Sequence, residues 1–232
     1  MKLLLQVILF FLSIHTNSAA EILQDRQQSI AHADAIEQFW KWFSKNESRL
    51  RAFESDPDKY LMELLEQSRK IKRGLAIELE PAKNGIINLT VSADGNVDLF
   101  PLVTDVVTKA PAIKGWRFIA FRQRVPSSAV KEMNMKVGSL FLEPSKMKFL
   151  PVVDHGKLNI IIYADGITAE NYEQVAYAGL ILLDSALGEY DAATKVEAFD
   201  FRALPGKFSE GPVPQSFLEL AKFVDDFHKN NR

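Results

Sequence analysis

The chain has 232 residues, a formal charge of −2 at pH 7 and no cysteine. This charge argues against a nucleic-acid-binding protein, which normally carries a basic face. Without thiols the chain has no disulfide, no thiolate metal site and no cysteine nucleophile, and its length is that of one domain with room for two lobes.

The first twenty residues have the pattern of a secretory signal. Lys2 precedes an apolar run over residues 3–14, and small residues occupy positions 18–20. This order is typical of a charged segment, a short apolar segment and a cleavage site. We expect cleavage near Ala20 and a periplasmic or secreted mature chain, residues 21–232. Because the apolar run is too short to span a bilayer, we expect no stable membrane insertion after the signal is removed.

Two amphipathic helices are predicted next. Apolar side chains between residues 30 and 53 recur at spacings of three and four, which is the helical period. Asp56 followed by Pro57 is an N-cap with a first-turn proline, so the second helix is expected over residues 57–73. The short link between them favours an antiparallel pair.

The pattern then changes to strands. Apolar and polar residues alternate over residues 75–80 and 87–93, around a turn signal at 83–85, which predicts a hairpin with one apolar face. A short helix is expected over residues 102–109. Residues 116–124 are apolar on both faces in the middle, so we place this strand near the centre of the sheet.

The rest of the chain repeats this order. Further strands are expected at residues 139–142, 148–153, 158–164 and 196–203, and a final amphipathic helix is expected to carry the apolar residues between 217 and 227. Residues 87–95 (INLTVSADG) align with 158–166 (LNIIIYADG). The chain is therefore interpreted as two β-β-α-β halves. The alternative is that Ala-Asp-Gly is simply a common turn.

The most apolar segment after the signal, residues 171–190, is predicted to be a buried central helix. Glu189 and Asp191 then lie at a helix C-terminus, where cations are usually favoured. This unfavourable choice indicates a site or a tertiary cation such as Arg117 or Arg122. The alternative is an acidic turn with one structural ion pair.

These elements predict an α+β fold. A helical pair over residues 21–73 is followed, over residues 74–232, by one mixed or antiparallel sheet of two β-β-α-β halves with helices mainly on one face. The uncovered polar face of that sheet is a second candidate site, and a solvated surface is its alternative. The candidate binding residues from both places are Arg117, Arg122, Arg124, Glu189, Tyr190, Asp191 and Arg202.

The sequence contains none of the motifs that would assign a chemistry. It has no His-Glu-x-x-His zinc motif, no glycine-rich phosphate loop and no G-x-S-x-G nucleophile turn. We therefore expect no cofactor and no metal, and we name no catalytic residue.

Four segments carry a resemblance to a known family. They are residues 39–43 (FWKWF), 92–95 (SADG), 115–122 (GWRFIAFR) and 187–191 (LGEYD). With them the chain resembles a family of uncharacterised bacterial proteins of similar length, over most of the mature chain. The resemblance implies no activity, because the family has no assigned function.

Two hypotheses follow for the function. The first is a non-catalytic binding or accessory module of the cell envelope, acting on a protein or small-molecule partner. The alternative is a metal-independent hydrolase that uses paired carboxylates among Asp165, Glu189 and Asp191. The alternative requires two of these acids to share one cleft beside an apolar pocket.

Overall fold

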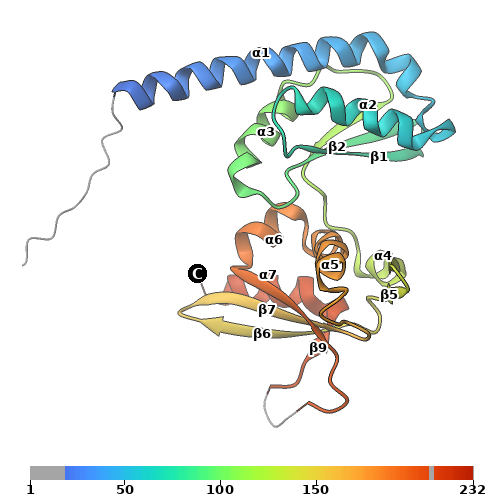
Figure 1. Cartoon of the computed structure of the whole chain (residues 1–232), viewed down its shortest axis with the longest axis vertical. Coiled ribbons are helices and arrows are strands. Elements are labelled where there is room, and N and C mark those ends of the chain that lie inside the picture. Colours follow the sequence, from blue (N-terminus) through green and yellow to red (C-terminus); the bar gives the residue numbers. More distant parts are fainter. Residues whose placement is uncertain (1–18, 209–211, 232) are drawn as a thin grey trace, which may run out of the picture.

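A computed structural model describes residues 19–208 and 212–231 (Figure 1). The fold is α+β, as predicted, and its two lobes follow one another along the chain, each around its own hydrophobic cluster. Residues 1–18, which hold most of the predicted signal, lie outside the described residues. None of the described helices is long and apolar enough to cross a membrane.

The first lobe contains the predicted helical pair and hairpin. Its elements are α1 (Ala19–Leu50), η1 (Phe53–Ser55), α2 (Pro57–Arg69), β1 (Ala76–Lys83), β2 (Ile86–Ser92), η2 (Val97–Leu99), α3 (Phe100–Thr108) and β3 (Trp116–Ala120). Asp56 caps α2 by accepting a hydrogen bond from the backbone N–H of Lys59 at 3.4 Å. The second helix therefore begins where the capping pattern places it.

The sheet of the first lobe has the order β1-β2-β3. β1 and β2 are antiparallel, and β2 and β3 are parallel. The prediction that residues 116–124 form a central strand is wrong, because β3 is at the edge and ends at Ala120. Both faces of β3 carry apolar residues, for different reasons. Phe118 packs against the hydrophobic core, whereas Ile119 is half-buried on the face that no helix of this lobe covers.

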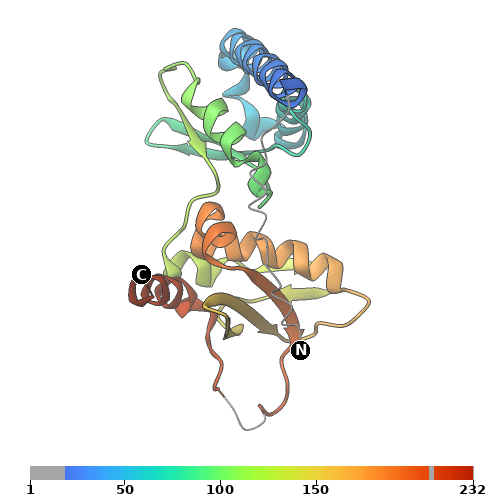
Figure 2. The same cartoon turned by 90° about the vertical axis from the view of Figure 1, so that its left-hand side faces the viewer.

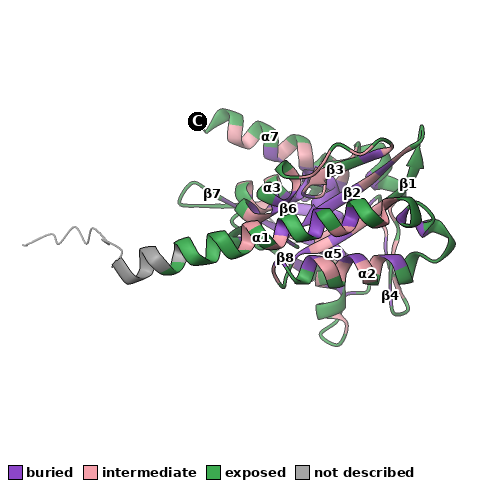
Figure 3. Cartoon of the chain, turned by 90° about the horizontal axis from the view of Figure 1, so that it is seen from above, coloured by how far each residue is buried: buried purple, intermediate pink, exposed green. Residues whose placement is uncertain are grey.

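Aromatic side chains attach the helices of the first lobe to one face of its sheet. Trp40 of α1 packs edge-on against Phe118 with ring centroids 4.5 Å apart, and Phe43 packs against Trp116 at 4.9 Å. The Trp40 indole N–H also donates to the carbonyl of Val106 on α3 at 2.8 Å. Residues 26–31 of α1 extend past the lobe and are exposed to solvent (Figure 3).

The second lobe begins after a short connection from β3 (Figure 2). Its elements are α4 (Ser127–Glu132), β4 (Met135–Val137), β5 (Leu140–Leu142), β6 (Lys148–Asp154), β7 (Lys157–Ala164), α5 (Tyr172–Leu187), α6 (Glu189–Lys195), β8 (Ala198–Ala203), β9 (Gln215–Ser216), η3 (Phe217–Glu219) and α7 (Leu220–Asn230). The main sheet has the order β8-β7-β6-β9, and β4 and β5 form a separate hairpin. Helices α5 and α7 pack on the apolar face of the main sheet.

The two halves share one topology. In each, an antiparallel hairpin leads to a helical crossover and a strand parallel to the second hairpin strand: β1-β2-α3-β3 and then β6-β7-α5-β8, where α6 extends the crossover. The predicted single sheet is corrected, because the halves form separate sheets. The residues between β3 and β6 fold into α4 and a small hairpin that pack on the second core, so the first sheet does not continue into the second.

Helix α5 approaches its sheet closely at Gly179. A Cβ atom built there would lie 2.1 Å from Cζ of Phe201 on β8, a distance that a folded core does not tolerate. We expect Gly179→Ala to lower the free energy of unfolding by about 1–3 kcal/mol, measured by urea denaturation. Gly206→Ala is the matched control, because a Cβ at Gly206 meets no atom within 4 Å.

Adding Phe201→Leu to Gly179→Ala should recover part of the lost stability, since the smaller side chain vacates the space. Equal stability of Gly179→Ala and the unaltered protein would show that α5 and β8 are further apart than the structure places them.

Candidate functional site

The candidate site is the junction where the two lobes meet. The turn after β2 and the connection after β3 come from the first lobe's sheet, and the end of α5 with the start of α6 comes from the second lobe. Backbone groups join them: Glu189 N–H donates to the carbonyl of Arg122, and Val125 N–H donates to that of Ser185, both at 2.9 Å. Arg122 and Glu189 were both predicted site residues.

Gly188 divides the predicted central helix in two. Its φ of 81° lies in the left-handed region, which glycine adopts without steric cost, and the helix continues as α6 in a new direction. The prediction of one helix over residues 171–190 is therefore corrected. Glu189 and Asp191 lie in the first turn of α6, where negative charge is favourable, so the acids are not at an unfavourable helix end.

The carboxylate of Glu189 is buried and held by three backbone N–H groups. Its Oε1 accepts from Ala93 at 2.8 Å and from Gly95 at 3.2 Å, and its Oε2 accepts from Arg122 at 3.0 Å. The residue has no exposed surface. Because the donors belong to the turn after β2 and the connection after β3, one carboxylate fastens α6 of the second lobe to the first. The predicted cation for this acid contributes its backbone N–H and not its guanidinium.

The guanidinium of Arg122 is shared by three carboxylates from both lobes. It pairs with Glu78 of β1 through Nε, with Asp94 through Nη2 at 2.5 Å, and with Asp184 of α5 through Nη1 at 3.1 Å. Burial disfavours the charged form, but the hydrogen bonds and Coulomb attraction of Asp94 and Glu78 outweigh it and raise the pKa of Arg122. The cation is therefore permanently charged.

Asp184 is the least accessible of these partners. Only 1% of its side chain is exposed, against 45% for Glu78 and for Asp94. Burial raises the pKa of Asp184 from its ordinary 3.8 to about 6, against the lowering effect of Arg122. The attraction does not prevail because the single guanidinium is shared, and the charges of Glu189 and Asp94 add repulsion.

This raised pKa makes the stability depend on pH. Between about pH 6 and pH 4 the folded protein binds a proton at Asp184 that the unfolded chain does not bind, so the free energy of unfolding falls as pH rises through this window. The change amounts to about 3 kcal/mol for a pKa difference of about two. Urea denaturation of the unaltered protein and of Asp184→Asn tests this expectation. Between pH 4 and pH 7 the unaltered protein should lose about 3 kcal/mol of stability relative to Asp184→Asn.

A pH-independent difference between the two proteins over this range would contradict the buried, proton-binding state of Asp184.

Arg124 forms a second charged cluster beside the junction. It donates to Asp225 of α7 at 2.6 Å and to Asp191 of α6 at 3.4 Å, and its Nε donates to the carbonyl of Leu187. Lys195 completes the cluster with an ion pair to Asp191 at 2.8 Å. These groups lie nearer the surface, where ion pairs contribute little to stability.

Tyr190 continues the contact between the lobes through aromatic packing. Its ring stacks on Phe100 of α3 with centroids 5.5 Å apart and lies 5.7 Å from the ring of Phe121. About half of the residue is still exposed. Five predicted binding residues therefore meet at the junction: Arg122, Arg124, Glu189, Tyr190 and Asp191.

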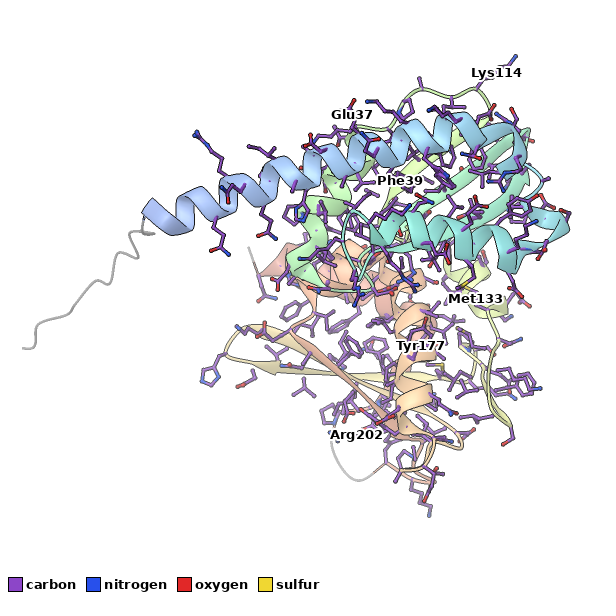
Figure 4. All side chains as sticks on the ribbon, turned by 45° about the horizontal axis from the view of Figure 1, so that its top comes forward. Glu37, Phe39, Lys114, Met133, Tyr177 and Arg202 are labelled. Carbon is purple, nitrogen blue, oxygen red and sulfur yellow. The ribbon has the colours of Figure 1, made fainter. Side chains whose placement is uncertain are left out.

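The other two predicted residues lie elsewhere. Arg117 is exposed on β3, beside Asn88 of β2, on the uncovered face of the first sheet. Arg202 is on β8, paired with Asp200 at 2.7 Å, at the end of the molecule away from the first lobe (Figure 4). The predicted polar face is thus divided, because the two sheets are separate.

A cleft of about 290 Å³ opens beside the junction on the side of α6. Asp94 and Gly95 of the first lobe line one side, and the other is mostly apolar, with Leu180, Ala192, Ala193, Val196 and Phe199. Tyr177 lies one helical turn before Leu180 on α5 and is 65% exposed (Figure 4). Exposed aromatic side chains of this kind are enriched in binding surfaces.

Sequence reasoning missed the partners of Arg122. Asp184 carried a usable signal, since a charged residue inside an otherwise apolar helix must find a partner when that helix is buried. The sequence around Asp94 is that of an ordinary turn, and Glu78 occupies a polar position of an alternating strand. Neither pattern indicates that the residue pairs with Arg122.

No protein-family model, curated protein or solved structure matches the chain. The geometry of the junction, the adjoining cleft and the sequence are therefore the basis for assigning a function.

Proposed function

We propose that the protein is an exported, non-catalytic binding or accessory module of the cell envelope. Its binding surface is the apolar side of the cleft between the lobes together with the exposed aromatic side chains next to it, Tyr177 and Phe199. The observation that carries this proposal is the position of that surface. It adjoins a junction whose charged groups bind one another, so the two lobes present it in one fixed arrangement.

Fixed presentation matters for affinity. A surface that is already ordered loses little conformational freedom when a partner binds. Tyrosine and phenylalanine supply large contact areas with few rotatable bonds, and tyrosine adds a hydroxyl at the rim. The acids at the edge of the cleft, Asp94 and Glu197, are already paired with Arg122 and Lys157, so the apolar side of the cleft supplies the contact area.

The arrangement of the acids gives the hydrolase alternative no support. Asp165 precedes α5 and Glu189 follows it, and the 16-residue helix between them is about 24 Å long, whereas paired catalytic carboxylates lie about 5–10 Å apart. Glu189 is buried with both oxygens accepting backbone hydrogen bonds, and Asp191 is paired with Arg124 and Lys195.

Export is proposed from the sequence pattern of residues 1–20. Mass spectrometry of the protein recovered from the envelope fraction tests it directly. A mature chain beginning at Glu21 supports the proposal, and an unprocessed chain found in the cytoplasm contradicts it.

Site-specific photo-crosslinking in the native cells tests the binding surface. A photoreactive phenylalanine at Tyr177 should give a discrete adduct with one partner, and Leu180→Asp in the same chain should remove it. Met62 of α2, which is 51% exposed on the first lobe, is the matched control position. Adducts of equal intensity from both positions, or none from Tyr177, would contradict the proposed surface.

A further inference from the structure

A second cleft, of about 630 Å³, lies on the first lobe between α1 and the end of α3. We call it the α1–α3 groove. Apolar surface comes from Ala33 of α1, from Pro111 after α3 and from the edge of Trp40, which is otherwise buried in the core. Three lysines surround it: Lys41, Lys45 and Lys109. Its volume is within the range of about 300–1,000 Å³ that is typical of small-molecule sites.

The groove carries more positive than negative charge. Glu37, the acidic residue in its lining, is paired with Lys41 at 2.5 Å. Lys109 is 3.9 Å from Asp105, a long ion pair, and Lys45 makes no ion pair within residues 19–208 and 212–231. At least one ammonium group is thus available to an anion, beside a second that is weakly held.

The charge is concentrated at one end. Lys41 and Lys45 are one turn apart on α1, and Lys109 is on the opposite wall, next to the α3 residues that Trp40 contacts. Ala33 precedes Lys41 by eight residues, which is about 12 Å along a helix. The groove therefore has a cationic end and a small end at Ala33, with the carboxylate of Glu37 between them neutralised by Lys41.

The backbone of α1 offers no hydrogen bonds to a bound peptide backbone, and the Ser44 hydroxyl is a neutral hydrogen-bonding group that α1 presents there. The N–H and C=O groups in the interior of a helix are already paired with each other, so a peptide placed along α1 would leave amide groups unpaired, at a cost in free energy. An alkyl chain has no such groups. Shape, charge and hydrogen bonding all favour a chain-like apolar tail with one anionic head.

We infer that the α1–α3 groove binds a single anionic amphiphile, a carboxylate or phosphate head on an alkyl chain. The head lies among Lys41, Lys45 and Lys109, and the tail runs along α1 towards Ala33. This site is separate from the cleft between the lobes, so it stands or falls independently of the function proposed above.

Isothermal titration with dodecanoate, below its micellar concentration, tests the inference on the purified protein. We expect saturable binding with one site per chain. Dodecyl trimethylammonium and dodecyl maltoside, which share the tail but lack the negative head, should bind at least tenfold more weakly. Equal binding of the three compounds, or no saturable binding of dodecanoate, would overturn the inference. Binding only to vesicles of anionic phospholipid would also overturn it and would assign the lysines to a membrane surface.

Charge-reversal variants locate the site. Lys45→Glu with Lys109→Glu should weaken dodecanoate binding at least tenfold, whereas Lys131→Glu, an exposed lysine on α4, should leave it unchanged. Glu37→Gln should strengthen binding, because it removes the negative charge within the groove. Ala33→Glu tests the tail end and should also weaken binding. Unchanged affinity in both the double lysine variant and Ala33→Glu, with circular dichroism showing folded protein, would overturn the placement.

Discussion

Replacing Arg122 with leucine is expected to lower the free energy of unfolding by about 3–5 kcal/mol at pH 7, the cost of leaving a buried charge without its partner. Most of this loss comes from Asp184, whose side chain is 1% exposed and cannot reach water. Glu78 and Asp94 are each 45% exposed, so they can be solvated when the cation is gone. Urea denaturation followed by tryptophan fluorescence measures the change.

Two further variants separate this effect from a general loss of a surface arginine. Arg117→Leu on β3 is the matched control, because Arg117 is exposed, and it should change the stability by no more than about 0.5 kcal/mol. Adding Asp184→Asn to Arg122→Leu should restore at least about 1 kcal/mol, because the asparagine needs no cation. If Arg122→Leu and Arg117→Leu are equally stable, the guanidinium does not hold the junction.

Glu189→Ala is expected to cost about 3 kcal/mol and to loosen the contact between the lobes. Three backbone N–H groups would lose a charged acceptor, and each hydrogen bond to a charged group contributes about 1.5–3 kcal/mol net. Part of this loss is offset, because the variant also removes the cost of burying a carboxylate. Hydrogen exchange measured by NMR reads the same change residue by residue. The amides of Ala93, Gly95 and Arg122 should lose protection, because all three donate to this carboxylate.

A conservative variant of Glu189 and a variant of a neighbouring acid test whether the Glu189 carboxylate itself protects these amides. Glu189→Gln keeps one oxygen acceptor and places an N–H₂ group against one donor, so its loss should be smaller than that of Glu189→Ala. Asp191→Asn, two residues along α6 and nearer the surface, should leave the three amides protected. Unchanged protection in Glu189→Ala would mean that these amides are shielded by packing and that the carboxylate is not the fastening group.

Local patterns predicted most of the secondary structure because local physics decides it. The helical period of α1, the Asp56-Pro57 start of α2, the alternation in β1, β2 and β8 and the expected strand β7 all appear in the fold. The repeated β-β-α-β order was also visible, since turn residues and strand lengths are properties of short segments. Residues 1–18 remain outside the described part of the chain, so the signal stays a prediction.

Local sequence patterns could not predict which strands pair in a sheet or where a helix changes direction. The alternation in each half predicts an apolar face but not which strands share a sheet, so the expected single sheet became two. The residues 171–190 read as one helix because Gly188 is a single residue in an apolar run, and helix propensity costs only about 1 kcal/mol at a glycine. The turn of the chain there is decided by the contacts of Glu189 and Arg122.

The sequence alone determined the α+β class, the order of the longer helices and strands and five of the residues that meet at the junction, because these follow from periodicity, turn chemistry and charges in unusual places. Only the tertiary structure decided what those residues do. Glu78, Asp94 and Asp184 are up to 106 residues apart in the chain, and no local rule brings them to one guanidinium. They meet at Arg122 because folding buries it between two lobes, where a charge must be paired to remain.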